Sequence, residues 1–557
     1  MHFKSSITSP QETGAVRKEW GGRLPVLLVY PDTYRAGMSN LAVHVLYGIL
    51  NGIGDVVCER CFWRKGQEAP VSIEGGRGAG DFSVIAFSVS FETDYINVVD
   101  FLRAAGLGIF AAGRTHGPVV IAGGIAVTLD PEPIADFVDA CIIGEAEGLV
   151  DRVIDVVHGG IRKGLAKEEV LQMLDDIRGV YVPSFYRVEY DAGDAIAGIH
   201  HRYKDGKKVR RHLADSLERV SSTVIYTADT TFSGMHLQEI SRGCAYRCRF
   251  CIAGYAYLPP RSRDIRSLQE DLAALPLGVR RVGIVSPMVT DYPHLTELLD
   301  HVHARGLTAS LSSLRADSAE LLGISSADVS TDQFSAALAP ETGTYRLRKV
   351  LNKQMSDDHI MRAVDVLSGL RVNTLKLYFL IGVPTETDED VAAIAALALR
   401  VKKRLRTGKG RVSVSINPLI PKPFTPFQWL GVIGPDHVRH RLGIVRGLLK
   451  GSGIRVEWEK HYLLQAVLSR GDRRLADFLV YMAGTDRPVS TALKESGVDI
   501  GRYAFKRYGQ DEALPWDFMD YGFDKAFLWK EYSLGLKGVV TPPCRPEACT
   551  LCGVCAV

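Results

Sequence analysis

The 557-residue sequence predicts an α/β protein: a doubly wound parallel sheet, then a partial (β/α) barrel, then a mainly helical C-terminal part. Two observations predict this fold. Short apolar runs alternate with helix-like stretches in both halves of the chain. Glycine is also frequent, at 54 residues, and glycines supply the tight turns between strands and helices.

The first expected domain, residues 1–160, alternates buried strands with helices. Four apolar runs are the expected core strands: 25–30, 82–89, 119–122 and 138–143. This alternation predicts a Rossmann-like (flavodoxin-like) sheet, in which ligands bind at the carboxyl ends of the strands. The residues at those ends are small or polar: Asp32, Ser88, Ser90, Gly123 and Gly124. No Gly-x-Gly-x-x-Gly motif follows the first strand, which argues against a dinucleotide ligand.

A connector, residues 161–235, precedes the second strand–helix unit, residues 236–430. The basic run 204–211 in the connector is expected to be a solvated hairpin turn, with RNA contact as the alternative. Six expected strands make the second unit a partial barrel, with functional loops after each strand: 237–240, 281–285, 308–311, 333–337, 374–381 and 412–416. Residues 431–557 are expected to be mainly helical and to end in a cysteine cluster.

Composition excludes several classes of protein. The hydrophobic fraction is 46% and the charged fraction 24%, which rules out wholesale disorder. No apolar run approaches the ~18 residues of a membrane helix, so no membrane insertion is expected. The net charge of +3 is too small to indicate a nucleic-acid-binding stripe, although a local patch remains open. The sequence also lacks a secretory signal, so we expect a cytoplasmic protein with reduced thiols.

Seven of the ten cysteines form two tight clusters, and the central one is the more informative. Cys244, Cys248 and Cys251 have the spacing C-x3-C-x2-C directly after the first expected barrel strand. Three thiolates can hold a 4Fe-4S cluster and leave one iron open for chemistry. Zinc binding or buried thiols are the alternative, but no nearby residue completes a standard zinc spacing.

This loop resembles the signature of the radical S-adenosylmethionine (SAM) superfamily, including the aromatic Phe250 before the third cysteine. The resemblance implies that SAM binds the open iron. One electron, delivered by a flavodoxin- or ferredoxin-type donor, then cleaves SAM to a 5′-deoxyadenosyl radical. The residues that resemble SAM contacts are Phe250, Ser286, Ser312, Arg315, Glu341 and Gly382. Ser286 stands where the family usually has a Gly-Gly-Glu-like motif, so the sequence departs from the pattern there.

The N-terminal domain resembles the cobalamin-binding class of this superfamily, and similar segments recur along nearly the whole chain. The positions that would contact cobalamin are Asp32, Ser39, Ser88, Ser90, Gly123 and Gly124. No Asp-x-His-x-x-Gly motif is present, so cobalamin is expected to bind base-off without a histidine ligand. A nucleotide-binding or empty domain is the alternative.

Three smaller groups of residues leave alternatives open. Cys544, Cys549, Cys552 and Cys555 fit an auxiliary iron–sulfur cluster, structural zinc or redox-active thiols. Cys58 and Cys61 are expected to be ordinary thiols. Arg470, Arg473 and Arg474 are expected to pair with carboxylates at a domain interface, with contact to an anionic substrate as the alternative.

The resemblance implies a cobalamin-dependent methyltransferase that acts on an unactivated carbon or phosphorus centre. One alternative is radical sulfur insertion, methylthiolation or another modification of RNA or protein that uses an auxiliary cluster. The other is a non-catalytic cobalamin- or redox-responsive binding protein. The sequence identifies neither the substrate nor a general base.

Overall fold

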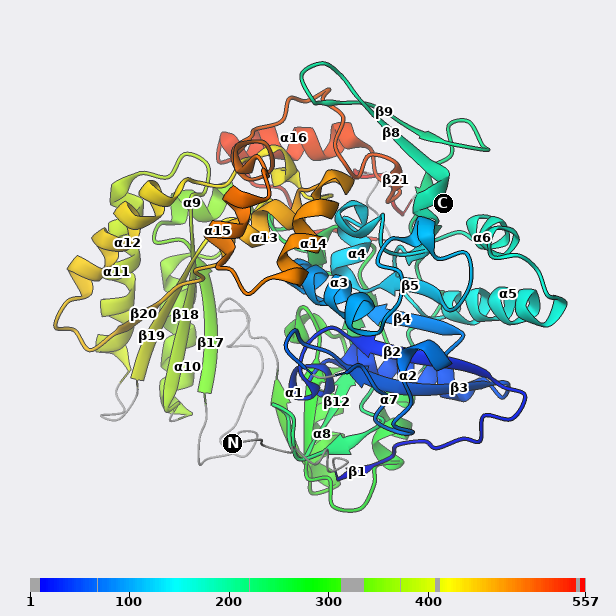
Figure 1. The fold of residues 1–557 in the computed structure, drawn as a ribbon. Coiled ribbons are helices and arrows are strands. Elements are labelled where there is room, and N and C mark those ends of the chain that lie inside the picture. Colours follow the sequence, from blue (N-terminus) through cyan, green and yellow to red (C-terminus); the bar gives the residue numbers. More distant parts are fainter. Residues whose placement is uncertain are drawn as a thin grey trace, which may run out of the picture.

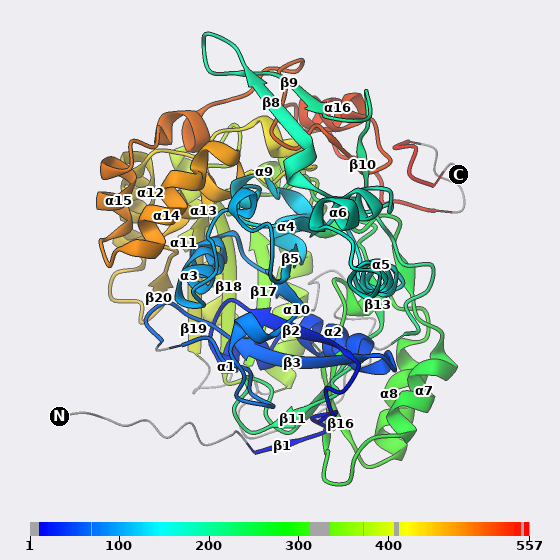
Figure 2. The same ribbon diagram turned by 45° about the vertical axis from the view of Figure 1, so that its right-hand side comes forward.

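The computed structural model describes residues 11–67, 69–219, 221–311, 335–370, 372–405, 411–546 and 551–555. It contains an N-terminal six-stranded sheet, two further parallel sheets and a helical C-terminal part. In Figure 1 the N-terminal sheet lies on the right and the sheet of β17–β20 on the left. Figure 2 shows the same arrangement turned by 45°.

The N-terminal sheet has the strand order β3-β2-β4-β5-β6-β7. Its strands are β2 (Leu24–Tyr30), β3 (Val56–Phe62), β4 (Val84–Ser88), β5 (Val119–Gly123), β6 (Ala140–Ile142) and β7 (Val180–Tyr181). All neighbours pair in parallel except β6 and β7, which pair antiparallel. The strands are almost continuously apolar because both faces of the sheet are covered. The expected doubly wound sheet is confirmed.

Local capping interactions in this domain include the N-cap of α2 (Leu41–Gly52). Asn40 caps this helix by accepting a hydrogen bond from the backbone N–H of Ala42. The other helices are α1 (Tyr34–Met38), α3 (Tyr95–Ala104), α4 (Ile125–Leu129), α5 (Leu149–Lys163) and α6 (Lys167–Asp175). Asp94 immediately precedes α3, in the short 3-10 helix η2 (Glu92–Asp94). The connector adds the hairpin of β8 (Tyr186–Tyr190) and β9 (Ile196–His201) and the short strand β10 (Val209–Arg210).

The second unit is split into two parallel sheets. The first contains β12 (Met235–Glu239), β15 (Arg281–Val285) and β16 (Thr308–Leu311), with α7 (Ile265–Ala273) and α8 (Leu295–Ala304) packed beside it. The second contains β17 (Ser335–Glu341), β18 (Thr374–Ile381), β19 (Arg411–Pro418) and β20 (Arg455–Glu457). Six of these seven strands match the expected barrel strands, whereas β20 lies past residue 430, in the region expected to be helical.

The remaining elements connect the units or complete the C-terminal part. Short pairs are formed by β1 (Glu12–Thr13) with β11 (Tyr226–Thr227), by β13 (Ser241–Arg242) with β14 (Arg261–Ser262), and by β10 with β21 (Met519–Asp520). The later helices are α9 (Tyr345–Val350), α10 (Asp357–Gly369), α11 (Asp388–Arg404), α12 (Pro435–Leu449), α13 (Tyr462–Ser469), α14 (Ala476–Gly484), α15 (Val489–Glu495) and α16 (Lys525–Leu536).

The C-terminal helices hold the N-terminal domain against the barrel. Helix α14 packs on α3, and α13 lies against η2. Three arginines were expected to pair with carboxylates at a domain interface; Arg473 and Arg474 do pair with carboxylates, but Arg470 does not. Arg473 pairs with the buried Glu132, Arg474 pairs with Asp472, and Arg470 donates to backbone carbonyls. The Arg473–Glu132 pair joins the C-terminal part to the N-terminal domain, whereas Arg470 and its carbonyl partners all belong to the C-terminal part.

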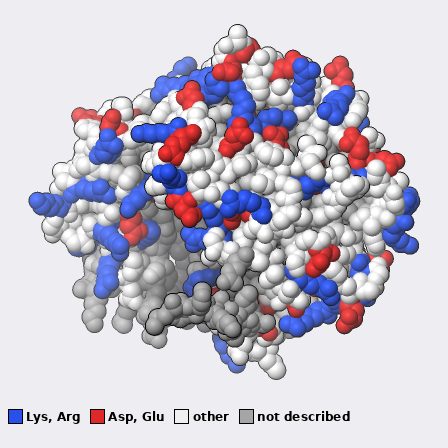
Figure 3. All heavy atoms as spheres, viewed as in Figure 1, with Lys and Arg blue, Asp and Glu red and all other residues white. Residues whose placement is uncertain are grey.

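The surface carries both signs of charge. In the view of Figure 3, Lys and Arg side chains are interspersed with Asp and Glu, without a continuous basic stripe. Within the described ranges, the helices are too short or too polar to cross a lipid bilayer.

Candidate functional site

A cavity of about 920 Å³ lies between the N-terminal sheet and the first barrel sheet. One wall is the face of β2 and β4 that carries Val26, Leu28, Val84 and Ala86, together with the carboxyl ends of β4, β5 and β6. The opposite wall comes from the ends of β12 and β15 and from η6 (Ile252–Gly254), the short helix after the third cysteine of the central cluster. The cavity therefore adjoins both the ligand-binding edge of the sheet and the cysteine loop.

The inner part of the cavity is apolar. Val26 and Leu28 of β2 pair in register with Val84 and Ala86 of β4, and all four line it. Helices α2 and α5 form the facing wall, through Leu41, Val45, Leu46, Leu50, Val150, Val153 and Ile154. The sheet and these helices are therefore separated by a space with mainly apolar walls.

The mouth of this space carries small and polar residues that were expected at the strand ends. Ser88, Ser90, Gly123 and Gly124 all line the cavity. The Ser90 hydroxyl accepts a hydrogen bond of 2.7 Å from the side-chain amide of Asn40. Gly124 has φ +101°, and a Cβ there would lie 2.3 Å from the Val89 carbonyl oxygen, so only glycine fits.

Two of the expected cobalamin positions lie elsewhere. Asp32 is not among the cavity-lining residues, and its carboxylate accepts from the Thr33 N–H. Ser39 bonds to the Arg35 carbonyl and lies 3.0 Å from the Thr230 hydroxyl. Asp32 precedes the N-cap of α1 and Ser39 is the C-cap residue of the same helix, and neither lines the cavity.

A charged wall closes the side of the cavity toward β14. Arg242 forms ion pairs of 2.9 Å with Glu147 and 2.6 Å with Glu239. These carboxylates raise the pKa of Arg242 further above its ordinary value, although burial opposes them. Glu145 pairs with Arg261 and lies 3.5 Å from Arg242. The pKa of Glu145 falls below its ordinary value because these arginines outweigh burial.

A second ion pair lies at the rim between the domains. Lys422, from the loop after β19, pairs with the buried Glu92, and Gln465 of α13 donates to the same carboxylate at 3.2 Å. Burial alone would raise the pKa of Glu92, but Lys422 brings it below the ordinary value. A charged carboxylate therefore faces the cavity, held by residues from two distant parts of the chain.

The cysteine loop joins β13 to η6. Burial raises the pKa of the Cys251 thiol to about 12, and the neighbouring Cys248 and Cys244 raise it as well. The loop backbone is tight, since a Cβ on Gly254 would lie 2.8 Å from the Cα of Arg247. Arg249, between the second and third cysteines of the loop, is fully buried and pairs with Glu531 at 3.2 Å. The fold thus gathers the three thiols among buried cations.

The structure describes four of the six residues that were expected to contact SAM, and their contacts differ. The Ser286 hydroxyl lies 2.6 Å from that of Ser241 and lines the cavity. Glu341, at the end of β17, acts electrostatically on Cys251 and pairs with Lys353 at 2.8 Å. Gly382 donates its N–H to Glu386, and Phe250 packs among Leu351, Val383 and Phe427. Ser312 and Arg315 lie outside the described residues.

The C-terminal tail returns to the cysteine loop. The backbone N–H of Cys544 donates to the Ala245 carbonyl, and Arg247 donates to the Pro542 carbonyl at 2.9 Å. Cys544 and Cys552 are buried and Cys555 is half-buried, whereas Cys549 lies outside the described residues. Cys58 and Cys61 are buried in β3, and burial raises the pKa of both thiols, as expected for ordinary core cysteines.

Sequence reasoning missed several residues of the site. The pair Glu145 and Glu147 follows a strand end directly, a position that could have marked them as candidates. Lys422 and Gln465 carry no such signal, because they reach Glu92 only through the packing of domains more than 300 residues apart in the chain.

Two family models match the chain. Residues 42–183 match the family described as radical SAM proteins, N-terminal, and residues 239–398 match the radical SAM superfamily. The uncharacterized protein MJ0966 of Methanocaldococcus jannaschii is 31% identical over 496 residues, which cover 86% of this chain and 97% of that protein. A tRNA-2-methylthio-N(6)-dimethylallyladenosine synthase of Rickettsia bellii is 24% identical over 178 residues, 29% of this chain and 40% of that enzyme.

One solved structure shares the fold over most of the chain. It is the radical S-adenosylmethionine methyltransferase TsrM from Kitasatospora setae, with cobalamin and a [4Fe-4S] cluster bound. The TM-score is 0.51 at 13% sequence identity, and the match covers 85% of this chain and 99% of that chain.

Proposed function

The chain belongs to the radical SAM superfamily, and from this premise we propose that it is a cobalamin-dependent methyltransferase acting on an unactivated carbon or phosphorus centre. One observation supports the proposal above the others. The cavity that begins at the carboxyl edge of the N-terminal sheet ends at Ile252 and Ala253, the two residues after Cys251. A molecule bound at the N-terminal sheet would therefore lie next to a group bound by the cysteine loop.

The central loop fits a 4Fe-4S cluster. Its donors are three thiols, and Arg247 and Arg249 are buried nearby, where they would offset the negative charge of thiolates and cluster. In the part of the chain that the structure describes, no three His, Cys, Asp or Glu side chains converge on one ion. A four-iron cluster does not need such convergence, because each of its cysteines binds a different iron.

The cavity fits cobalamin. Its apolar inner part, between β2, β4, α2 and α5, would hold the nucleotide base, and Gly124 would let the tail approach the backbone closely. No histidine lines the cavity within the described residues, in keeping with base-off binding without a histidine ligand. TsrM, which shares this fold, carries both cobalamin and a [4Fe-4S] cluster.

When bound, the cluster supplies the electron that cleaves SAM, and cobalamin supplies the methyl group. The chain positions these groups and excludes water. Glu341 and Ser286 stand at strand ends next to the loop, where they would hold the polar parts of SAM. The ion pairs of Arg242 and Lys422 would close the two sides of the cavity, since the partner carboxylates are buried.

Anaerobic reconstitution tests the proposal. The full chain is loaded with iron, sulfide, cobalamin and SAM and reduced by flavodoxin or dithionite. Iron, sulfide, cobalt and the nucleoside products are then measured. We expect 5′-deoxyadenosine together with S-adenosylhomocysteine. Loss of cluster sulfide into product would instead favour sulfur insertion, and failure to cleave SAM in the fully loaded protein would favour a binding protein.

Two variants separate the cofactors. Cys248→Ala should abolish SAM cleavage but leave cobalamin bound. Ala86→Trp fills the apolar part of the cavity and should reduce bound cobalt from about one per chain to about a tenth, without loss of iron. Ala112→Trp, at an exposed position outside the cavity, is the matched control. Full cobalt loading of Ala86→Trp would refute the assignment of this cavity.

A further inference from the structure

A second cavity, of about 960 Å³, lies beside the first at the edge of the interface between the N-terminal domain and the barrel. Its walls come from the start of α5, the connector, β14, and the C-terminal residues 520–522 and 553–554. Glu147 lines both cavities. The proposed cofactors do not use this second space.

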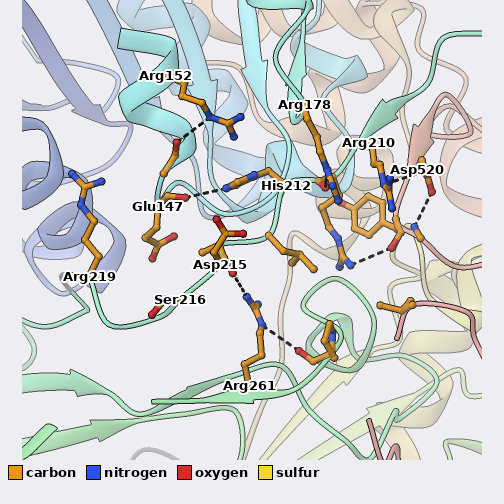
Figure 4. Close-up of a pocket in the computed structure, with 18 of the residues that line it drawn as sticks. Glu147, Arg152, Arg178, Arg210, His212, Asp215, Ser216, Arg219, Arg261 and Asp520 are labelled. Carbon is orange, nitrogen blue, oxygen red and sulfur yellow. Dashed lines mark hydrogen bonds and ion pairs between the residues drawn. The ribbon is translucent and has the colours of Figure 1, made fainter. Parts of the chain in front are cut away.

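Arginine is the commonest residue in the lining of the second cavity. Figure 4 shows Arg152, Arg178, Arg210, Arg219 and Arg261 around a common space. With Arg211 the lining holds six arginines, against three carboxylates from Glu147, Asp215 and Asp520. Glu147 is already paired with Arg242. The lining therefore has excess positive charge.

Several of these arginines lack a close carboxylate. Arg152 donates to the Gly148 carbonyl at 3.2 Å and Arg178 to the Arg211 carbonyl at 3.4 Å. Neither forms an ion pair with any described residue, and Arg210 reaches Asp520 only at 4.0 Å. Arg219 and Arg261 are paired, with Asp151 and Glu145. Three guanidinium groups thus keep most of their donors for another partner.

The first turn of α5 adds to the positive charge around the second cavity. The N-cap residue, Gly148, lines the cavity and has no side chain to cap the helix. Helix α5 has 15 residues, long enough for a developed dipole whose positive end lies at this turn. Burial lowers the pKa of Arg178, and repulsion by Arg210 and Arg152 lowers it further, whereas Asp520 and Asp215 oppose the shift. A bound anion would relieve that repulsion.

We propose that this cavity binds a small molecule that carries a phosphate or diphosphate group. Arginine forks match the oxygen geometry of phosphate and bind it in a bidentate manner. A bounded cavity of this size suits a small phosphorylated molecule better than a nucleic acid, which needs an extended basic surface. The inference rests on the arginine geometry and holds whether or not the first cavity binds cobalamin.

The neighbouring basic run does not extend the site into a nucleic-acid surface. Lys204 pairs with Asp175 and Asp176, and Lys207 pairs with Asp175. These carboxylates neutralise the two lysines. The lysines therefore do not extend the arginine cluster into a surface for an RNA backbone.

Titration calorimetry with pyrophosphate tests the site in the full chain loaded with iron and cobalamin. We expect one binding site, and at least a tenfold weaker affinity in the double variant R152Q/R178Q. Both arginines are exposed in the free protein, so the substitutions should leave the fold intact. Arg455→Gln, on β20, removes another exposed arginine that does not line the cavity, and should change the affinity less than twofold.

Three results would overturn the proposal: no binding of pyrophosphate to the wild type, equal binding by the double variant, or equal weakening by Arg455→Gln. If a short RNA bound through the same arginines more tightly than pyrophosphate, the ligand of this cavity would be RNA and the proposal of a small molecule would be wrong. Cobalt and iron contents, measured on the same samples, report separately on the proposed function.

Discussion

The backbone N–H of Cys544 donates a hydrogen bond of 2.7 Å to the carbonyl of Ala245, between the first two cysteines of the central loop. The C-terminal tail thereby supports the loop from outside the barrel. Thr541 adds to this support, because its hydroxyl lies 3.2 Å from Arg249 and 2.9 Å from Glu531.

Deletion of residues 541–557 should therefore slow SAM cleavage about tenfold or more, since the loop loses the partners that orient it. The rate of 5′-deoxyadenosine formation by the reconstituted protein measures this effect. The quadruple variant C544S/C549S/C552S/C555S keeps the backbone contacts and is the matched control. It should retain most of the activity, and an equal loss in both proteins would show that the tail acts through its cysteines instead.

The ion pair of Lys422 and Glu92 should matter for stability. Lys422→Met leaves a buried carboxylate without its cation, which costs about 3–5 kcal/mol. The double variant K422M/E92Q removes both charges and should recover part of that loss. Thermal unfolding of the cofactor-free chain measures the stability of the wild type, the single variant and the double variant. If the double variant is less stable than the single one, the pair does not carry the stability assigned to it.

Gly124 and Gly123 provide a contrast within one turn. Gly124→Ala combines an unfavourable positive φ with a clash against the Val89 carbonyl, and should destabilise the protein by about 2 kcal/mol or more. Gly123→Ala places its Cβ 3.4 Å from Ile142, an ordinary contact, and should change stability little. The denaturant concentration at the unfolding midpoint, measured for both variants, tests this prediction. Equal midpoints would contradict the strained geometry at Gly124.

His44 should make the protein acid-sensitive. Burial, with a further contribution from Arg60, lowers the pKa of His44 to about 4, although its hydrogen bond to the Met38 carbonyl opposes this. The unfolded chain binds a proton near pH 6.5, so it takes up more protons than the folded state below that pH. Stability should fall by up to about 3 kcal/mol as the pH drops from about 6.5 to about 4.

His44→Gln keeps a neutral polar side chain and should flatten this part of the pH profile. The measurement is the denaturant midpoint at several pH values for both proteins. An unchanged pH dependence in the variant would mean that His44 titrates normally in the folded state.

Much of the fold could be predicted because its signals are local. Most strands of the N-terminal sheet are nearly continuous apolar runs, and β18 and β19 alternate buried with more exposed residues. β20 escaped prediction because Arg455–Glu457 is short and polar on its exposed side. Asp32 follows a strand end, like Ser88, but only Ser88 lines the cavity, and no pattern in the sequence distinguishes the two.

The sequence by itself determined the loop of Cys244, Cys248 and Cys251, because three ligands on one short loop depend only on their spacing. The tertiary structure alone decided what surrounds them. Lys422 meets Glu92, Arg242 meets Glu147 and Cys544 meets Ala245 only after separate apolar surfaces have packed together. Such packing is a property of whole faces, and the spacing of residues along the chain does not encode it.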